Sequence, residues 1–246
     1  MKKIIFAALL VVITASSVCY ADEVEDLLGY YVNRFTPEKA ELVISEKPDA
    51  TGKFSDIYMN LTGVMIEGLR LNRLAFRMRG VQFNKPSEWK KGNVKCTDAI
   101  KIDAIGELYE RDVNKAIEAK TFGKKDGHWH DMNLKITPQG LKGRGYYTAT
   151  VMIIPLDILL EIDSGLKVVK GTELWLNNPQ VKVNTLDVPD YVTRQALTKI
   201  QPIVDLKKIS LPMTLHKVDL KKGVATLSTR TLPKPLTDGI KYSYSK

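Results

Sequence analysis

Apolar and polar residues alternate along most of the chain beyond residue 39, or form short runs rich in β-branched side chains. A repeat of two residues is the pattern of a β-strand with one buried face. The strands predicted in this way span residues 40–44, 57–62, 69–83, 100–105, 133–137, 146–154, 156–162, 166–169, 173–176, 180–183, 213–220 and 224–228. Glycine beside charged or polar residues separates several of them and predicts tight hairpin turns. These turns fall at residues 139–140, 163–165, 170–171 and 221–223.

Three other segments repeat their apolar residues every three or four positions, which is the spacing of an amphipathic helix. They span residues 23–35, 107–117 and 191–200. Pro202 ends the third, since the residue before a proline disfavours helical backbone angles. The chain is therefore predicted to be α+β and mostly β, with helices that pack one side against a sheet.

The strand over residues 69–83 needs an irregularity to keep a single apolar face. In a regular strand Leu69 and Leu71 would point to one face, whereas Leu74, Phe76 and Met78 would point to the other. A bulge with one extra residue near residues 72–73 would bring all five to the same face, and we predict one there. A second one-sided strand follows over residues 156–162. The apolar residues of the two strands are Leu69, Leu71, Leu74, Phe76, Met78, Leu156, Ile158, Leu160 and Ile162. Long one-sided strands suit a strongly curved sheet, and we expect these residues to line a lipid-binding site, with a plain packed core as the alternative.

Four arginines are interspersed with the apolar residues of the first of these strands. They are Arg70, Arg73, Arg77 and Arg79. Two interpretations stay open. The arginines are either ordinary solvated strand residues, or a basic ridge that holds a lipid phosphate while a neighbouring apolar groove takes the acyl chains. We favour the second, which makes these four residues the predicted headgroup site.

The beginning of the chain has the layout of a secretory signal peptide. Two lysines precede an apolar run over residues 4–12, and a small-residue exit ends at Ala21. An uncleaved anchor is the alternative, but the run is shorter than the roughly 20 apolar residues of a spanning helix. We expect residues 1–21 to be removed and residues 22–246 to form one extracytoplasmic domain, periplasmic in a cell with two membranes.

Net charge indicates the kind of partner, and cysteine content indicates how the domain is stabilised. The formal net charge falls from +9 to +7 when residues 1–21 and their two lysines are removed, and Cys96 is then the single cysteine. A domain of this size can bury a sufficient core without a disulfide. Phospholipid headgroups and acidic polymers are the common anionic surfaces outside the cytoplasm. We therefore predict membrane lipid as the partner and expect no nucleic acid.

Catalytic signatures are missing from the sequence: there is no G-x-S-x-G, no P-loop and no G-x-G-x-x-G. The glycines of residues 140–145 are too closely spaced for a nucleotide loop and are predicted to be hairpin residues. His128 and His130, beside Asp131, could begin a metal site, but the sequence offers no convincing ligand to complete it. Asp157, Glu161 and Asp163 share a strand face that is normally the solvent side of a half-buried sheet. We predict no catalytic residue, no metal and no cofactor, so that an enzyme acting on lipid or glycan is the weakest hypothesis.

Several short patterns occur in a fixed order along the chain. They are Gly-Val-Gln-Phe at 80–83, a strand-then-helix unit at 104–117, a strand and turn at 134–141, two strands joined by Asn-Pro at 174–183, and Asp-Leu and Leu-Pro within 202–213. In this order, over about residues 40–228, the chain resembles the LmeA-like phospholipid-binding family. The resemblance implies a long curved antiparallel sheet wrapped around an amphipathic helix to form an apolar tube or half-barrel, akin to bactericidal and lipid-transfer proteins. It also implies a role in envelope lipid or lipoglycan metabolism, and no catalytic residues.

Two functional hypotheses from different classes follow. The first is an extracytoplasmic phospholipid-binding protein, and a lipid carrier in its stronger form. The second is a non-catalytic structural or interaction protein of the envelope that docks on anionic membrane or polymer surfaces. A carrier needs a cavity of several hundred cubic ångströms, whereas an interaction protein fills its own interior.

Overall fold

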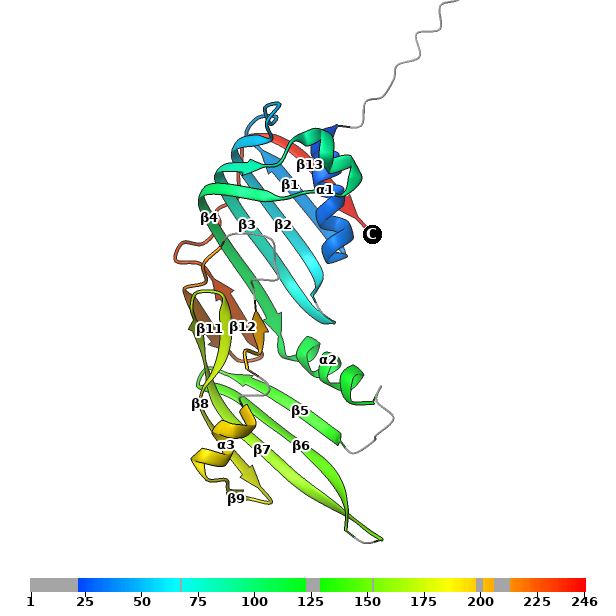
Figure 1. The fold of residues 1–246 in the computed structure, drawn as a ribbon, viewed down its shortest axis with the longest axis vertical. Coiled ribbons are helices and arrows are strands. Elements are labelled where there is room, and N and C mark those ends of the chain that lie inside the picture. The colour runs from blue at the N-terminus through cyan, green and yellow to red at the C-terminus, as the bar shows by residue number, and fades with distance from the viewer. Residues whose placement is uncertain (1–21, 67, 123–128, 152, 198–200, 206–212) are drawn as a thin grey trace, which may run out of the picture.

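The computed structural model describes residues 22–66, 68–122, 129–151, 153–197, 201–205 and 213–246. The predicted signal peptide and His128 lie outside these ranges. The described residues are mostly strand and form two antiparallel sheets, of seven and six strands, arranged along the length of the molecule (Figure 1). None of the described helices is long and apolar enough to cross a membrane.

The seven-stranded sheet has the order β11-β12-β4-β3-β2-β1-β13. Its strands are β1 (Lys39–Ile44), β2 (Lys53–Ile66), β3 (Leu69–Phe83), β4 (Cys96–Tyr109), β11 (Lys217–Lys221), β12 (Val224–Ser228) and β13 (Ile240–Ser245). Sequence periodicity did not predict β13, which pairs with β1 and so brings the C-terminal segment beside the first strand.

The second sheet has the order β10-β8-β7-β6-β5, with β9 paired to β8. Its strands are β5 (Trp129–Thr137), β6 (Gly140–Val151), β7 (Ile154–Val169), β8 (Glu173–Val183), β9 (Leu186–Asp187) and β10 (Val204–Asp205). The prediction of one long sheet is thus corrected to two, because a helix follows β4 and the next strand, β5, pairs with β6 instead of returning to the first sheet.

The described part of the chain has four helical elements beside the sheets: α1 (Glu23–Phe35), the short 3-10 helix η1 (Pro86–Lys91), α2 (Glu110–Phe122) and α3 (Asp190–Leu197). The bounds of α1 are those predicted, and the Asp22 carboxylate caps it by accepting a hydrogen bond from the Val24 amide. The second helix begins three residues later than predicted, because β4 continues to Tyr109 and pairs there with Val224 of β12. Residues 198–200 of the third predicted helix lie outside the described residues.

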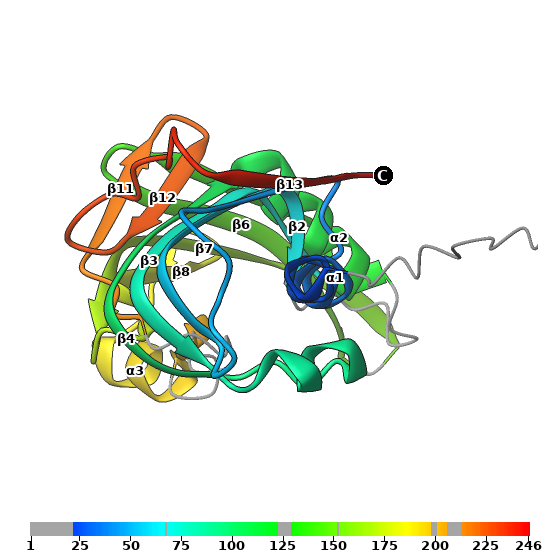
Figure 2. The same ribbon diagram turned by 90° about the horizontal axis from the view of Figure 1, so that it is seen from above.

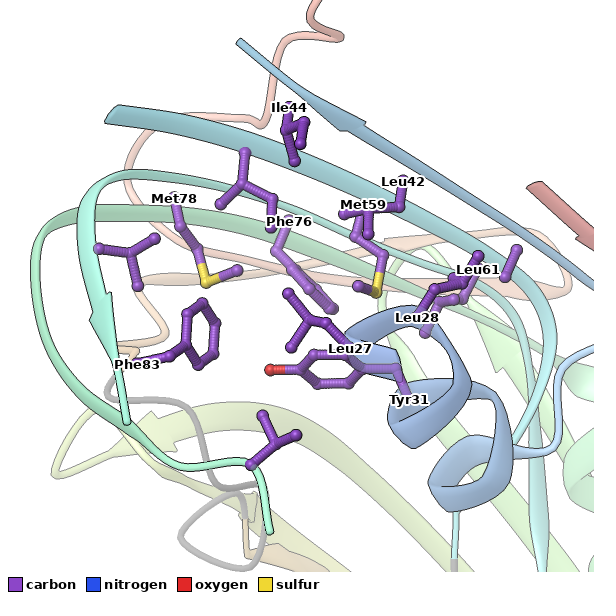
Figure 3. Close-up of a cluster of buried hydrophobic side chains, with 14 of the residues drawn as sticks. Leu27, Leu28, Tyr31, Leu42, Ile44, Met59, Leu61, Phe76, Met78 and Phe83 are labelled. Atoms are coloured by element: carbon purple, nitrogen blue, oxygen red, sulfur yellow. The ribbon is translucent and has the colours of Figure 1, made fainter. Parts of the chain in front are cut away.

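The core lies between α1 and the inner face of the first sheet. Leu27 and Tyr31 of α1 pack against Leu42, Met59 and Phe76 of the sheet, and all of these side chains are almost completely buried (Figure 3). Seen from above, β2, β3 and β4 curve around the side on which α1 lies (Figure 2). The amphipathic pattern of α1 therefore covers this end of the sheet.

The irregularity in β3 differs from the predicted bulge. Leu71 and Leu74 do lie on the same apolar side of the sheet, as predicted. However, the pairing of β3 with β2 keeps one register throughout this region, with Leu71 opposite Val64 and Leu74 opposite Leu61. Gly63 of β2 has a φ of 67°, in the left-handed region that favours glycine. Both strands thus bend together at Gly63, and no extra residue is inserted into β3.

Two predicted chain breaks are also wrong. Residues 163–165 were predicted to form a turn, but they lie inside the continuous strand β7, where a register shift opposite β8 takes up the irregularity. The Asn-Pro pair at residues 178–179 lies inside β8 and does not form a hairpin. The turns at 139–140, 170–171 and 221–223 do join consecutive strands as predicted.

Candidate functional site

A cavity of about 900 Å³ lies where the two sheets meet. The first sheet contributes residues from the β2–β3 end, from β4 and from β11 and β12, and the second sheet contributes residues from β5 to β8. The end of α1, Val113 of α2 and the loop residues Pro202, Ile203, Met213 and Leu215 also border the cavity. A volume of about 900 Å³ is within the size range of ligand sites in proteins.

The side chains that line the cavity are almost all apolar. Ser164 is the polar exception, and its hydroxyl already donates to the backbone carbonyls of Gly165 and Asn177, at 2.8 and 3.2 Å. The charged exception is Arg34, in the last turn of α1. The other described side chains of the wall are apolar. Such a surface favours hydrocarbon over polar substrates, because it leaves a polar ligand without hydrogen-bond partners.

Helix α2 lies between the two sheets (Figure 1) and contacts β3 and β4 of the first and β5 of the second. The Asn114 side chain donates to the Leu134 carbonyl at 2.9 Å and accepts from the Leu134 amide at 2.7 Å. A carboxylate oxygen of Glu110 accepts from the Ile136 amide at 2.7 Å. These bonds pair backbone N–H and C=O groups on the edge of β5 that faces no strand. They thereby fix Leu134 and Ile136 in the cavity wall.

Small residues on the first sheet leave room for the cavity. Ala104, Gly106 and Ala225 lie in strands β4 and β12 and border the space. A methyl group at Gly106 would meet a single atom within 4 Å, Cδ2 of Leu71 at 3.5 Å. Sequence reasoning missed these residues, because alanine and glycine contribute little to an apolar repeat.

The structure places the predicted lining residues in three different surroundings. Leu69, Leu71, Leu74 and Ile162 border the cavity. Phe76 and Met78 are fully buried in the core instead. Leu156, Ile158 and Leu160 follow the same face of β7 beyond the cavity, where Leu156 is exposed and the other two are half-buried. The lipid contacts of these residues stay a prediction.

The four arginines of β3 lie away from the described cavity wall, and each has an acidic partner. The pairs are Arg70 with Glu38 and with Asp112, Arg73 with Glu107, Arg77 with Asp56 and Arg79 with Asp103. The hydrogen bonds that Arg70 donates to the Glu38 carboxylate raise the pKa of Arg70, and those that Arg77 donates to the Asp56 carboxylate raise the pKa of Arg77. Through these contacts the arginines form ion pairs on the sheet, and their role in binding a lipid headgroup stays a prediction.

Arg34 is the basic residue that sequence reasoning missed. One of its guanidinium nitrogens donates to the Tyr30 hydroxyl at 3.2 Å, and its guanidinium lies 5.9 Å from the centre of the Phe35 ring. Met65 and Leu69, at the β2–β3 end, border the same cavity. The only available signal in the sequence was an arginine in the last turn of an amphipathic helix, which is a common arrangement.

A second hollow, of about 470 Å³, lies between α1 and β13. It is smaller and its wall includes Glu25, Asn33 and Lys241. Because of these polar and charged side chains, it is less suited to acyl chains than the cavity between the sheets.

The remaining candidate groups do not assemble a reactive centre. His130 lies between Asp131 and Asp157, at 3.0 and 3.3 Å, and its contacts with these carboxylates, Asp131 first, raise its pKa. Among the described residues no three histidine, cysteine, aspartate or glutamate side chains are grouped so that they could hold a metal ion. Burial raises the pKa of the Cys96 thiol to about 11, which disfavours the reactive thiolate.

Comparison with known proteins gives one match. A family model described as LmeA-like phospholipid-binding matches residues 48–223. No curated protein and no solved structure matches the chain significantly. The matched range contains the whole second sheet and β2, β3, β4 and β11 of the first. It therefore includes most of the cavity wall.

Proposed function

This chain belongs to the LmeA-like phospholipid-binding family, and on that premise we propose that it binds one phospholipid with the acyl chains in the cavity between its two sheets. The observation that carries the proposal is the cavity itself, about 900 Å³ in volume and apolar apart from Ser164 and Arg34. The competing hypothesis, an interaction protein of the envelope with a filled interior, has no comparable support.

The energetics favour a protein that exchanges lipid with membranes. Each methylene group moved out of water contributes about 0.8 kcal/mol, so a bound acyl chain is strongly held against release into water. A bilayer offers the same chain an equally apolar environment. The hydrophobic terms therefore nearly cancel between the cavity and the membrane, and small contributions at the headgroup decide the direction of exchange.

Arg34 is the group that we assign to the lipid phosphate. It is the charged side chain of the described cavity wall, at the end of α1 where the wall also includes Met65 and Leu69. A guanidinium presents several N–H donors in a planar fork that matches phosphate oxygens. An arginine at the rim of an apolar cavity thus holds the headgroup in water while the acyl chains are buried.

The wider setting of the proposal is the cell envelope. The first 21 residues support export, and the charge of +7 in the remaining chain supports contact with anionic membrane surfaces. In this proposal the inner faces of the two sheets, together with α1, act as one apolar half-barrel. The protein then serves envelope lipid or lipoglycan metabolism by holding or moving lipid, without catalysing a reaction.

Bound lipid can be measured directly. The full chain is expressed, and the exported protein is purified without detergent. It is then extracted with organic solvent, and co-purifying phospholipid is quantified by mass spectrometry. Near-stoichiometric phospholipid is expected. A folded protein that contains no lipid and also takes up none from vesicles would refute the proposal.

Two matched variants locate the bound lipid. Leu134→Trp places extra bulk in the cavity wall, whereas Lys135→Trp places the same side chain at the next, exposed position of β5. Overpacking costs about 1–3 kcal/mol, so lipid occupancy should fall roughly tenfold or more in Leu134→Trp. Occupancy should be unchanged in Lys135→Trp. Equal loss in both variants, or in neither, would place the lipid elsewhere.

A further inference from the structure

The hairpin that joins β6 to β7 exposes large apolar side chains. Ile153 is 91% exposed, Ile154 59% and Leu156 47%. Residues 145–156 contain no charged side chain. The hairpin forms the far end of the second sheet, away from α1 (Figure 1). Contiguous apolar exposure of this kind marks a surface that contacts a partner or a membrane.

The apolar face of β7 connects this hairpin to the cavity. Side chains alternate along a strand, so Leu156, Ile158 and Leu160 lie on the same face as the cavity residues Ile162 and Leu166. The cross-strand partner of Ile158 is Tyr147, and the partner of Leu160 in β8 is Val183. A strip of apolar residues therefore runs from the cavity to the exposed end of the hairpin.

The opposite face of the same hairpin carries polar and charged side chains, with the half-buried Leu159 between Asp157 and Glu161. Asp157 accepts a hydrogen bond from Thr148 at 2.7 Å and contacts His130 at 3.3 Å. Glu161 and Asp163 follow along that face. The hairpin therefore has one face suited to hydrocarbon and one suited to water, which is the arrangement of an element that lies in the interface of a bilayer.

We propose that the β6–β7 hairpin inserts its apolar end into a phospholipid bilayer, and that acyl chains pass between the membrane and the cavity along the apolar face of β7. The inference rests on the proposed function, because the strip is useful for lipid exchange only if the cavity holds lipid. The strip's continuity with the cavity and the polar opposite face of the hairpin favour a bilayer as the partner, because a bilayer supplies acyl chains and has an interface suited to an element with one apolar and one polar face.

The test compares two isoleucines of similar exposure. Ile153→Glu adds a charge to the hairpin, and Ile100→Glu adds one to β4 at a side chain that is 84% exposed. Vesicles of phosphatidylcholine and phosphatidylglycerol are used in a flotation assay, and transfer of a fluorescent phospholipid is followed between donor and acceptor vesicles. We expect Ile153→Glu to reduce vesicle binding and transfer at least about tenfold, while Ile100→Glu leaves both close to wild type.

Lipid content separates failure of this inference from failure of the proposed function. If wild-type protein holds lipid and Ile153→Glu retains its vesicle binding and transfer rate, the inference is overturned and the proposed function survives. If wild-type protein holds no lipid, the proposed function fails first. Light scattering supplies a third outcome: a wild-type dimer that Ile153→Glu abolishes, without vesicle binding by either, would assign the hairpin to contact between two copies and overturn the inference.

A tryptophan at the same positions reports insertion depth. Ile153→Trp and Ile100→Trp are compared on vesicles whose lipids carry bromine on the acyl chain, which quenches indole fluorescence at close range. Additional quenching in Ile153→Trp alone is expected. Equal quenching in the two variants would show that the hairpin does not enter the hydrocarbon and would contradict the inference.

Discussion

Replacing Asn114 with alanine should loosen the junction between the two sheets. The Asn114 side chain makes two hydrogen bonds to the backbone of Leu134, at 2.9 and 2.7 Å, on the edge of β5 that has no strand partner. Leu134 borders the cavity, so this contact joins the helix to the cavity wall. The substitution removes both bonds and leaves a partly buried donor and acceptor to be satisfied by water.

The magnitude follows from the contacts. Each hydrogen bond contributes about 1 kcal/mol net, so the pair contributes roughly 2 kcal/mol. Alanine has a higher helix propensity than asparagine, which returns about 0.6 kcal/mol. The free energy of unfolding of Asn114→Ala should therefore fall by about 1.5 kcal/mol. For a domain of this size the melting temperature should fall by about 3–6 °C.

Denaturant and thermal unfolding of lipid-free protein measure this change, with Lys115→Ala as the control at the next, exposed helix position. Hydrogen exchange at the Leu134 amide should accelerate in Asn114→Ala alone, because its acceptor is lost. Equal stability of the two variants, with unchanged exchange at Leu134, would refute the view that this side chain holds the sheets together.

Three further predictions concern charged residues. Arg34→Gln should reduce the preference for phospholipid over diacylglycerol, which has no phosphate, about tenfold in a competition assay, since a charge-assisted bond contributes about 1.5 kcal/mol or more. Arg70→Gln should instead lower the unfolding free energy by about 2 kcal/mol, measured in urea, and leave lipid preference unchanged, because it removes the closest cation from the buried Asp112 carboxylate. The pKa of His130, measured by NMR titration, should lie above 6.5 and fall in Asp157→Asn. Because the folded-state pKa is the raised one, His130 should add stability at pH values below about 6.5, and this contribution should disappear as the pH rises through the folded-state pKa.

Local patterns predicted local structure well. The three- and four-residue repeat of apolar side chains located α1 from Glu23 to Phe35, because a helix and its cap depend on neighbouring residues. Alternation likewise located most of the strands. The shared apolar side of Leu71 and Leu74 was also predicted, although the bend at Gly63 that produces it belongs to the neighbouring strand. The alternation of apolar and polar residues within β3 could not show that the bend lies in its neighbour β2.

Features set by distant parts of the chain were not predictable in this way. The pairing of β13 with β1 joins segments about 200 residues apart, and no local repeat encodes it. The acidic partners of the β3 arginines lie in β2, in β4, in α2 and, for Glu38, just before β1, so the sequence of β3 alone could not show that these arginines are paired. The cavity depends on residues that are small, such as Gly106 and Ala225, and on the way two sheets formed by distant parts of the chain meet.

Photo-crosslinking with a phospholipid that carries a reactive group on its acyl chain tests the central claim most directly. The protein is loaded with this lipid, irradiated and digested, and the modified residues are identified by mass spectrometry. Crosslinks should fall on the cavity wall, at residues such as Leu108, Leu166 and Leu174. Crosslinks confined to the outer faces of the sheets, or to the hollow between α1 and β13, would contradict a lipid site between the two sheets.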